Sequence, residues 1–257
     1  MTVIQTDKWL EKSYDKPEKI FQKLAEMFNL EDYREIASIL IKNGMYQKPE
    51  KNGENLINTL KNKNVWQIIK KEEQYLQKEW SGKNVPIFIF PSNSYNWKIK
   101  EHYKGRTGLA FHDKLFLFIS DETTEEELKA LFTHEYNHIC RLYQDPKKER
   151  NYSLLDVVIL EGIAENAVLE RFGAKPLAPW TSYYSESELK EIWNDLIFPN
   201  KDLSKTSRKS TNLLYGNSFY PEMAGYCVGY YLVKQYVKKT GIRTKDLIKI
   251  PAEKIVI

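Results

Sequence analysis

The residues with the clearest chemical potential form the pentad HEYNH at positions 134–138, which reads H-E-x-x-H. Residues four apart on a helix lie one above the other on the same face, so His134 and His138 can both reach one metal ion. Glu135 then lies beside that ion, where it can accept a proton from a metal-bound water molecule. This spacing indicates metal-assisted hydrolysis, and the alternative is a pair of surface histidines on an ordinary helix.

The segment around the pentad is helical on independent grounds. Thr123 and Thr124 are each followed three residues later by a glutamate, which is the capping-box pattern that opens helices. The apolar residues that follow recur at roughly helical spacing: Leu128, Leu131, Phe132, Ile139 and Leu142. We therefore predict a helix from about Thr124 to Tyr143, preceded by a buried strand over the apolar run LFLFI at 115–119.

A catalytic zinc site usually needs a third protein ligand, with water in the fourth position. One known pattern places a third histidine six residues after the second, with a glycine midway, but those positions hold Gln144 and Arg141. The next segment, 153–169, is almost wholly apolar and predicts a buried helix. Ser153 suits its N-cap and Gly173 its C-terminal cap, so the third ligand is sought on this helix.

Glu161 and Glu165 interrupt this apolar segment on one helical face. Buried carboxylates are costly unless they are paired, protonated or metal-bound, and a zinc ion with its histidine ligands would supply the positive partner. We predict Glu161 as the third metal ligand. Glu165 is then expected to hydrogen-bond a liganding histidine and fix its tautomer. The alternative is that both glutamates face solvent or pair with Arg141 or Arg150.

These motifs resemble those of the gluzincin metallopeptidases, in which H-E-x-x-H is followed by a glutamate; here 22 residues intervene and the glutamate stands in an E-G-x-A-E context. More narrowly, the chain resembles the bacterial YjaZ-like family of predicted zinc-dependent proteases, a domain of unknown function. The matching stretches are LFTHEYNH at 131–138, LEGIAE at 160–165 and PEMAGYCVGY at 221–230. The resemblance spans about residues 85 to 240 and implies a reaction type rather than a substrate.

Two features qualify the resemblance. The Gly-x-Met-Glu-Asn signature that anchors a substrate amino terminus in one aminopeptidase group is absent, which disfavours an aminopeptidase. Enzymes of this class often use a Tyr or His to hydrogen-bond the oxyanion. Tyr226 is our candidate, on a helix expected to begin at Pro221, and the alternative is that Tyr226 and Tyr230 are packing residues. On the same helix, Gly225 and Gly229 allow close approach of another helix.

Composition narrows the class of protein. The 257 residues carry 39 Lys and Arg against 35 Asp and Glu, and the net charge of +4 is too mild to indicate nucleic-acid binding. No apolar run approaches the ~20 residues needed to span a bilayer, and the first residues lack the basic start and apolar core of a signal peptide. With two cysteines, Cys140 and Cys227, and no C-x-x-C motif, we expect a cytoplasmic protein whose thiols stay reduced.

Periodicity and resemblance together predict an α+β, zincin-like fold, mostly helical, with a small and mainly antiparallel sheet beside the metal-binding helix. Residues 1–84 are expected to form an N-terminal helical region, and residues 85–257 the catalytic domain, either separate from it or continuous with it. Within the first region, apolar spacing predicts helices over 17–28, 33–43 and 56–80.

The expected sheet has strands at 85–90, 108–112 and 115–119, the last two joined as a hairpin through Asp113-Lys114. An antiparallel edge strand just before the zinc helix is where such peptidases hold a substrate backbone by strand addition. His112 is expected to be structural, because a lone histidine usually is, and the alternative is that it contacts the site. The segment 198–217 has few apolar residues and is expected to be a loop, and a candidate lid.

The function predicted from these observations is that of a zinc metallopeptidase acting on a peptide or protein, with Zn²⁺ as cofactor and Glu135 as general base. Nucleic acid is not an expected partner, no membrane-spanning segment is expected, and the oligomeric state is left open. The alternative is a zinc-binding, catalytically idle module that serves protein interaction or regulation. An intact H-E-x-x-H disfavours that alternative, because a purely structural zinc site does not need the glutamate and is usually closed by a fourth protein ligand.

Overall fold

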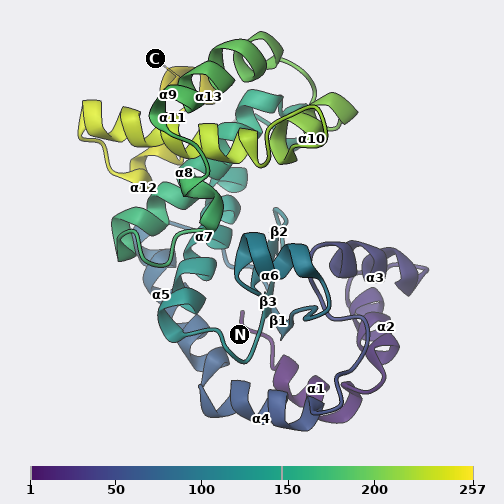
Figure 1. Ribbon diagram of the computed structural model, residues 1–257. Helices are drawn as coiled ribbons and strands as arrows, with labels where there is room; N and C mark the ends of the chain where they lie inside the picture. Colours follow the sequence, from purple (N-terminus) through teal and green to yellow (C-terminus); the bar gives the residue numbers. More distant parts are fainter. Residues whose placement is uncertain (1, 146, 257) are drawn as a thin grey trace. The chain divides into compact units, whose positions relative to one another are not determined.

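The computed structural model describes residues 2–145 and 147–256, and the chain divides into two compact units (Figure 1). The first unit comprises Met1–Lys78 and Asn84–Tyr136, and the second comprises Glu79–Lys83 and Asn137–Ile257. The division therefore falls within two helices. A helical region over 1–84 and a catalytic domain over 85–257 stay predictions.

The first unit begins with five helices. They are α1 (Thr6–Ser13), α2 (Pro17–Met27), α3 (Tyr33–Lys42), α4 (Gly53–Asn62) and α5 (Val65–Trp80), the last of which ends in the second unit. The helices expected over 17–28 and 33–43 are confirmed as α2 and α3. The single long helix expected over 56–80 is wrong, because Asn64 adopts a left-handed φ of 55° and separates α4 from α5. Asparagine tolerates this conformation better than most residues.

The sheet of the first unit has three strands, β1 (Ile87–Pro91), β2 (Thr107–Ala110) and β3 (Leu115–Ile119), with helix α6 (Trp97–Tyr103) between β1 and β2. Their spatial order is β1-β3-β2. The predicted hairpin is confirmed, since β2 pairs antiparallel with β3. β1 instead runs parallel to β3, so the sheet is mixed and the expected antiparallel arrangement holds for one of its two pairings. The α+β class is confirmed.

Strands β1 and β3 are buried on both faces, as their continuous apolar sequences predict. One face is aromatic: the rings of Phe88 and Phe116 stack with centroids 4.9 Å apart, and Phe28 meets both edge-on. Because side chains alternate along a strand, Leu115 and Leu117 point to the other face. The sheet therefore forms the core of this unit.

The two edges of the sheet differ. The outer side of β1 is covered by the N-terminal segment, where Ile4 donates to the Ile87 carbonyl at 2.9 Å and Ile87 donates to the Thr2 carbonyl at 2.8 Å. On the opposite edge, the Phe111 amide donates to the Lys114 carbonyl at 2.9 Å and closes the hairpin. Hydrogen-bonded and non-hydrogen-bonded pairs alternate along an antiparallel ladder.

This alternation decides which backbone groups of β2 face outward. The two strands pair in the register Ala110↔Leu115 and Gly108↔Leu117. The next pair toward the turn, Phe111 with Lys114, is hydrogen-bonded, so these two pairs are the non-hydrogen-bonded ones. The N–H and C=O groups of Gly108 and Ala110 therefore point away from β3, toward the outer edge of the sheet.

Two long helices carry the motif residues. Helix α7 (Glu125–Gln144) begins where Thr124 and Glu127 exchange capping hydrogen bonds, the Glu127 amide donating to Thr124 Oγ1 at 3.3 Å and the Thr124 amide to Glu127 Oε2 at 3.1 Å. The chain passes from the first unit to the second within this helix. Helix α8 (Leu154–Phe172) has a complete capping box at Ser153 and ends at Gly173, whose φ is 74°. Both helices confirm their predicted spans.

The rest of the second unit is helical. It contains η1 (Glu149–Asn151), η2 (Pro179–Ser182), α9 (Glu186–Glu191), the π-helix η3 (Ile192–Ile197), η4 (Phe198–Asn200), α10 (Arg208–Tyr215), α11 (Ala224–Thr240), α12 (Thr244–Leu247) and α13 (Ala252–Ile255). Over residues 2–145 and 147–256, no helix has both the length and the apolar character that crossing a membrane requires.

Two expectations for this unit are corrected. The segment 198–217 is not a loop throughout, because α10 forms within it and is capped by Ser207, whose side chain accepts from the Ser210 amide. The helix expected to begin at Pro221 begins at Ala224, because Met223 has a left-handed φ of 52° that precludes helix before it.

Candidate metal centre

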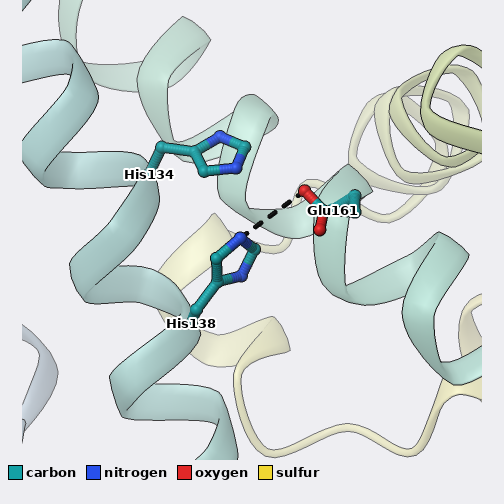
Figure 2. A group of neighbouring side chains, drawn as sticks. All are labelled: His134, His138 and Glu161. Carbon is teal, nitrogen blue, oxygen red and sulfur yellow. Dashed lines mark ion pairs between the residues drawn. The ribbon is translucent and has the colours of Figure 1, made fainter. Parts of the chain in front are cut away.

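The best-defined part of the candidate site lies in the second unit, where α7 and α8 bring His138 and Glu161 together. The distance from His138 Nε2 to Glu161 Oε2 is 3.5 Å, and each residue is only 8% exposed (Figure 2). Two ligands of a tetrahedral zinc ion, at bond lengths of about 2.0–2.1 Å, stand roughly 3.3 Å apart. The spacing of this pair therefore fits adjacent positions on one zinc ion.

His134 lies one turn earlier on α7, and Figure 2 shows its ring on the same side of the helix as that of His138. One ligand atom from each of His134, His138 and Glu161 lies within 4.8 Å of the others, and among the described residues this is the one His/Cys/Asp/Glu group with that property. A His₂Glu set of this kind leaves a fourth position for water. The donor types and their spacing therefore fit a catalytic zinc ion.

The two cysteines are poorly suited to bind a metal ion or to attack a substrate. Cys140 is fully buried two residues after His138 and lies outside the ligand group. Burial raises the pKa of the Cys140 thiol, and burial raises that of Cys227 to about 12. Neither thiol is therefore readily converted to the thiolate that binds metals or attacks substrates, and Cys227 instead donates to the Trp180 carbonyl at 3.0 Å.

Glu135 lies in the first unit, against the edge strand of the sheet. It is 7% exposed, and a Cβ built on Gly108 of β2 would overlap its Cγ and Cδ atoms and lie 2.6 Å from its Oε1. The glutamate of the motif thus occupies the space that any other residue at position 108 would fill. Its side chain lies beside the strand whose outward backbone groups belong to Gly108 and Ala110.

Glu165 is also buried, at 3% exposure, one turn after Glu161 on α8. Its Oε1 accepts a hydrogen bond from the Ala178 amide at 2.8 Å. Burial, with the negative charge of Glu165 nearby, raises the pKa of Tyr230 to about 12. The burial of both glutamates fits the expectation that they do not face solvent; the role of Glu165 toward a liganding histidine stays a prediction.

The position of Glu161 depends on how closely α8 approaches α11. A Cβ on Gly162 would overlap the carbonyl oxygen of Gly229 and lie 2.8 Å from Val233 Cγ2, and a Cβ on Gly229 would overlap the carbonyl of Val158. The two glycines therefore face each other where the helices cross. The sequence predicted a close approach at Gly225 and Gly229; Gly229 is the one that meets α8, and its partner Gly162 directly follows Glu161.

We expect Gly162→Ala to lower the free energy of unfolding by about 1–3 kcal/mol, the usual cost of overpacking a core. Alanine at an unhindered helical position would instead stabilise by roughly 0.4–1 kcal/mol, so the sign of the change is diagnostic. Urea denaturation measures it, with Lys238→Ala on the exposed side of α11 as a control expected to change stability by less than about 0.5 kcal/mol. A stabilised Gly162→Ala protein would show that the helices do not meet here.

Arg141 holds the end of α7 through contacts that sequence reasoning missed. It lies one turn after His138, is 1% exposed, and its Nη1 donates to the carbonyls of Leu247, Ile248 and Ile250 at 3.0, 3.1 and 2.9 Å. Nη2 lies 3.5 Å from Asp145 Oδ2. Burial lowers the pKa of the guanidinium, and the Asp145 charge opposes that shift. Arg141 thus fastens the end of α7 to the C-terminal segment rather than neutralising Glu161.

We expect Arg141→Met to destabilise the protein by about 3–5 kcal/mol, because it leaves Asp145 buried without its charge partner and three carbonyls without their donor. Chemical denaturation followed by circular dichroism gives the change. Arg150→Met, at an exposed arginine in η1, is the matched control. Equal stability of the two variants would mean that the buried guanidinium contributes nothing to the fold.

Two other residues singled out in the sequence lie as follows. Tyr226 is half-buried on α11; its hydroxyl donates to the Tyr215 hydroxyl at 3.2 Å, and its ring meets Trp180 edge-on with centroids 5.4 Å apart. Its role at an oxyanion stays a prediction. His112 stands at the hairpin turn with 71% of its side chain exposed, 3.8 Å from Asp113, and is not part of the ligand group.

Comparison with known proteins agrees with this site. The family described as "Predicted Zn-dependent protease (DUF2268)" matches residues 65–257. The chain is 38% identical to the uncharacterized protein YjaZ of Bacillus subtilis, over 98% of this chain and 97% of that one. It is 25% identical to the uncharacterized protein YjfC of the same organism, over 50% of this chain and 46% of that one. No solved structure matches significantly.

The family match covers both the H-E-x-x-H helix and the helix that carries Glu161. The similarity to YjaZ extends along nearly the whole of both chains, including the helical region before the sheet. The chain therefore belongs to the YjaZ-like family of predicted Zn-dependent proteases.

Proposed function

We propose that this protein is a zinc-dependent metallopeptidase that hydrolyses peptide bonds. The observation that carries the proposal is the His134, His138 and Glu161 group, whose ligand atoms lie within 4.8 Å of one another. A zinc ion held there supplies Lewis acidity, which lowers the pKa of a water molecule and polarises a carbonyl. Glu165, buried beside the group, is proposed to hold a liganding histidine in one tautomer through a hydrogen bond.

Glu135 is proposed as the general base and acid. It directly follows the first histidine ligand, so its carboxylate stands beside the reacting water. It accepts a proton as the water attacks the peptide carbonyl carbon, and it returns that proton to the leaving amine nitrogen when the C–N bond breaks. One carboxylate thus serves both halves of the reaction, and the products are a carboxylic acid and an amine.

The outer edge of β2 is proposed to hold the substrate backbone. The N–H and C=O groups of Gly108 and Ala110 point to that edge, while the opposite edge of the sheet is already covered by Thr2 and Ile4. An extended peptide adds a strand through such main-chain hydrogen bonds, which do not depend on its side chains. Since Glu135 lies against Gly108, a peptide paired there passes beside the general base.

Tyr226 is proposed to hydrogen-bond the oxyanion that develops on the attacked carbonyl. The Tyr226 side chain is half-buried in the second unit, and its hydroxyl donates a hydrogen bond to the Tyr215 hydroxyl. Reorientation toward a substrate would replace the Tyr215 oxygen by the oxyanion as the acceptor of this hydrogen bond. A reducing compartment also belongs to this proposal, because Cys140 and Cys227 are free thiols in the structure.

The proposal is tested by incubating the zinc-loaded protein with a broad peptide library and identifying the fragments by mass spectrometry. Cleavage that a chelator abolishes and added zinc restores is the expected result. Tight binding of library members with no cleavage at any concentration would instead favour a zinc-binding interaction module. Release of ammonia or an amine from non-peptide amides, with intact peptides, would move the reaction to another amide class.

A further inference from the structure

We propose that Gly108 is a positioning residue for Glu135: the missing side chain at position 108 is what lets the carboxylate stand beside the edge strand. The inference rests on the proposed role of Glu135 and goes beyond it, since it assigns a requirement to a residue that has no functional group. A Cβ at this position would overlap Glu135 Cγ and Cδ. Both residues lie in the first unit.

Backbone conformation does not explain this glycine. Gly108 is absent from the glycines with positive φ in the described chain, so an L-residue could adopt its backbone geometry. Glycine within a strand is destabilising, by roughly 0.5–1 kcal/mol relative to alanine, and it often marks a place where another group approaches closely. The approaching group here is the Glu135 side chain, which is 7% exposed.

A substitution at Gly108 is expected to move Glu135 rather than the strand. The backbone of β2 is held in register with β3 along its whole length, at Thr107 through Ala110, whereas the overlapping atoms belong to a side chain with rotatable bonds. Oε1 would lie 2.6 Å from the new Cβ, and ordinary contact begins at 3.4 Å. The oxygen must therefore retreat by at least about 0.8 Å (3.4 − 2.6), and a misplacement of about 1 Å near a reacting centre costs on the order of 10²-fold in rate.

The three atoms nearest to a Cβ at position 108 all belong to Glu135, and none belongs to a proposed zinc ligand. The Gly108→Ala protein is therefore expected to bind zinc as the wild type does. The outward N–H and C=O of position 108 also remain in the variant. We therefore expect kcat to fall by about 10²-fold while KM for a cleaved peptide and zinc per chain stay near their wild-type values.

The test compares wild type, Gly108→Ala, Glu135→Gln and the double variant, with Leu109→Ala on the opposite face of β2 as control. Zinc per chain, kcat and KM are measured, together with binding of a peptide hydroxamate by calorimetry. A hydroxamate chelates zinc and donates a hydrogen bond to a neighbouring carboxylate, so it reports the position of Glu135 without turnover. Loss of one hydrogen bond to a charged group weakens binding about tenfold or more.

The expected result is that Gly108→Ala and Glu135→Gln both weaken hydroxamate binding, that the double variant loses no more than Glu135→Gln alone, and that Leu109→Ala keeps wild-type affinity. Wild-type affinity in Gly108→Ala, or additive losses in the double variant, would overturn the positioning role. If no peptide is cleaved by the wild type but the hydroxamate pattern appears, the proposed peptidase function fails while the positioning of Glu135 by Gly108 stands.

Discussion

Replacement of Glu161 by alanine is expected to strip the protein of zinc. The wild type should carry about one zinc per chain, held by three protein ligands. Loss of an outer partner typically costs 10–100-fold in metal affinity, and loss of a direct ligand should cost more. Elemental analysis of protein dialysed against metal-free buffer measures the zinc content, and His134→Ala should show the same depletion.

Two glutamate variants make this result specific. Glu191→Ala, at an exposed position on α9, should keep the zinc content of the wild type. Glu165→Gln should retain zinc with affinity reduced about 10–100-fold if it supports a liganding histidine. A fully loaded Glu161→Ala protein would move the third ligand elsewhere, first to Glu165, and depletion in the Glu191→Ala control would point to a general loss of folding.

Replacement of Glu135 by glutamine is expected to lower kcat by about 10²–10⁴-fold while zinc remains bound, because the amide cannot accept and return the proton. The side chains have nearly the same shape, so the contact with Gly108 is retained. The rate of cleavage of a peptide identified from the library gives the change, with zinc per chain determined on the same samples. Glu122→Gln, at an exposed residue before α7, serves as the control.

Unchanged turnover in the Glu135→Gln protein would remove the general-base role from this residue. Loss of zinc together with turnover would instead show that Glu135 supports the metal site and would leave its chemical role untested by this variant alone. The hydroxamate measurements then separate the two effects, because they respond to the position of the carboxylate in zinc-loaded protein.

Local chemistry in the sequence determined the helices of the site and the class of reaction proposed for it. The caps at Thr124 and Ser153 and the glycine at 173 begin and end α7 and α8 as predicted, because capping depends on residues within one turn of each other. The spacing of His134 and His138 follows from the helical repeat in the same way. The burial of Glu161 could be predicted because its neighbours along the helix are apolar.

The sequence was a weaker guide to where helices are interrupted and to whether neighbouring strands run parallel or antiparallel. Asn64 divides an apolar pattern that is periodic enough for one helix, and Met223 delays the start of α11, since a single left-handed residue leaves little trace in hydrophobic periodicity. The parallel pairing of β1 with β3 depends on how the intervening chain returns, and no local signal fixes that path. A short apolar strand has the same sequence pattern whether it pairs parallel or antiparallel with its neighbour.

Only the tertiary structure decided which residues that are distant in the chain contact each other. Gly108 and Glu135 lie on a strand and a helix, Gly162 and Gly229 on two crossing helices, and Arg141 reaches carbonyls more than a hundred residues later. None of these pairs has a sequence spacing that implies contact, because the partner is chosen by packing of whole elements rather than by local propensity. The sequence by itself thus named the candidate ligands and the proposed base, and the packed structure decided which contacts surround them.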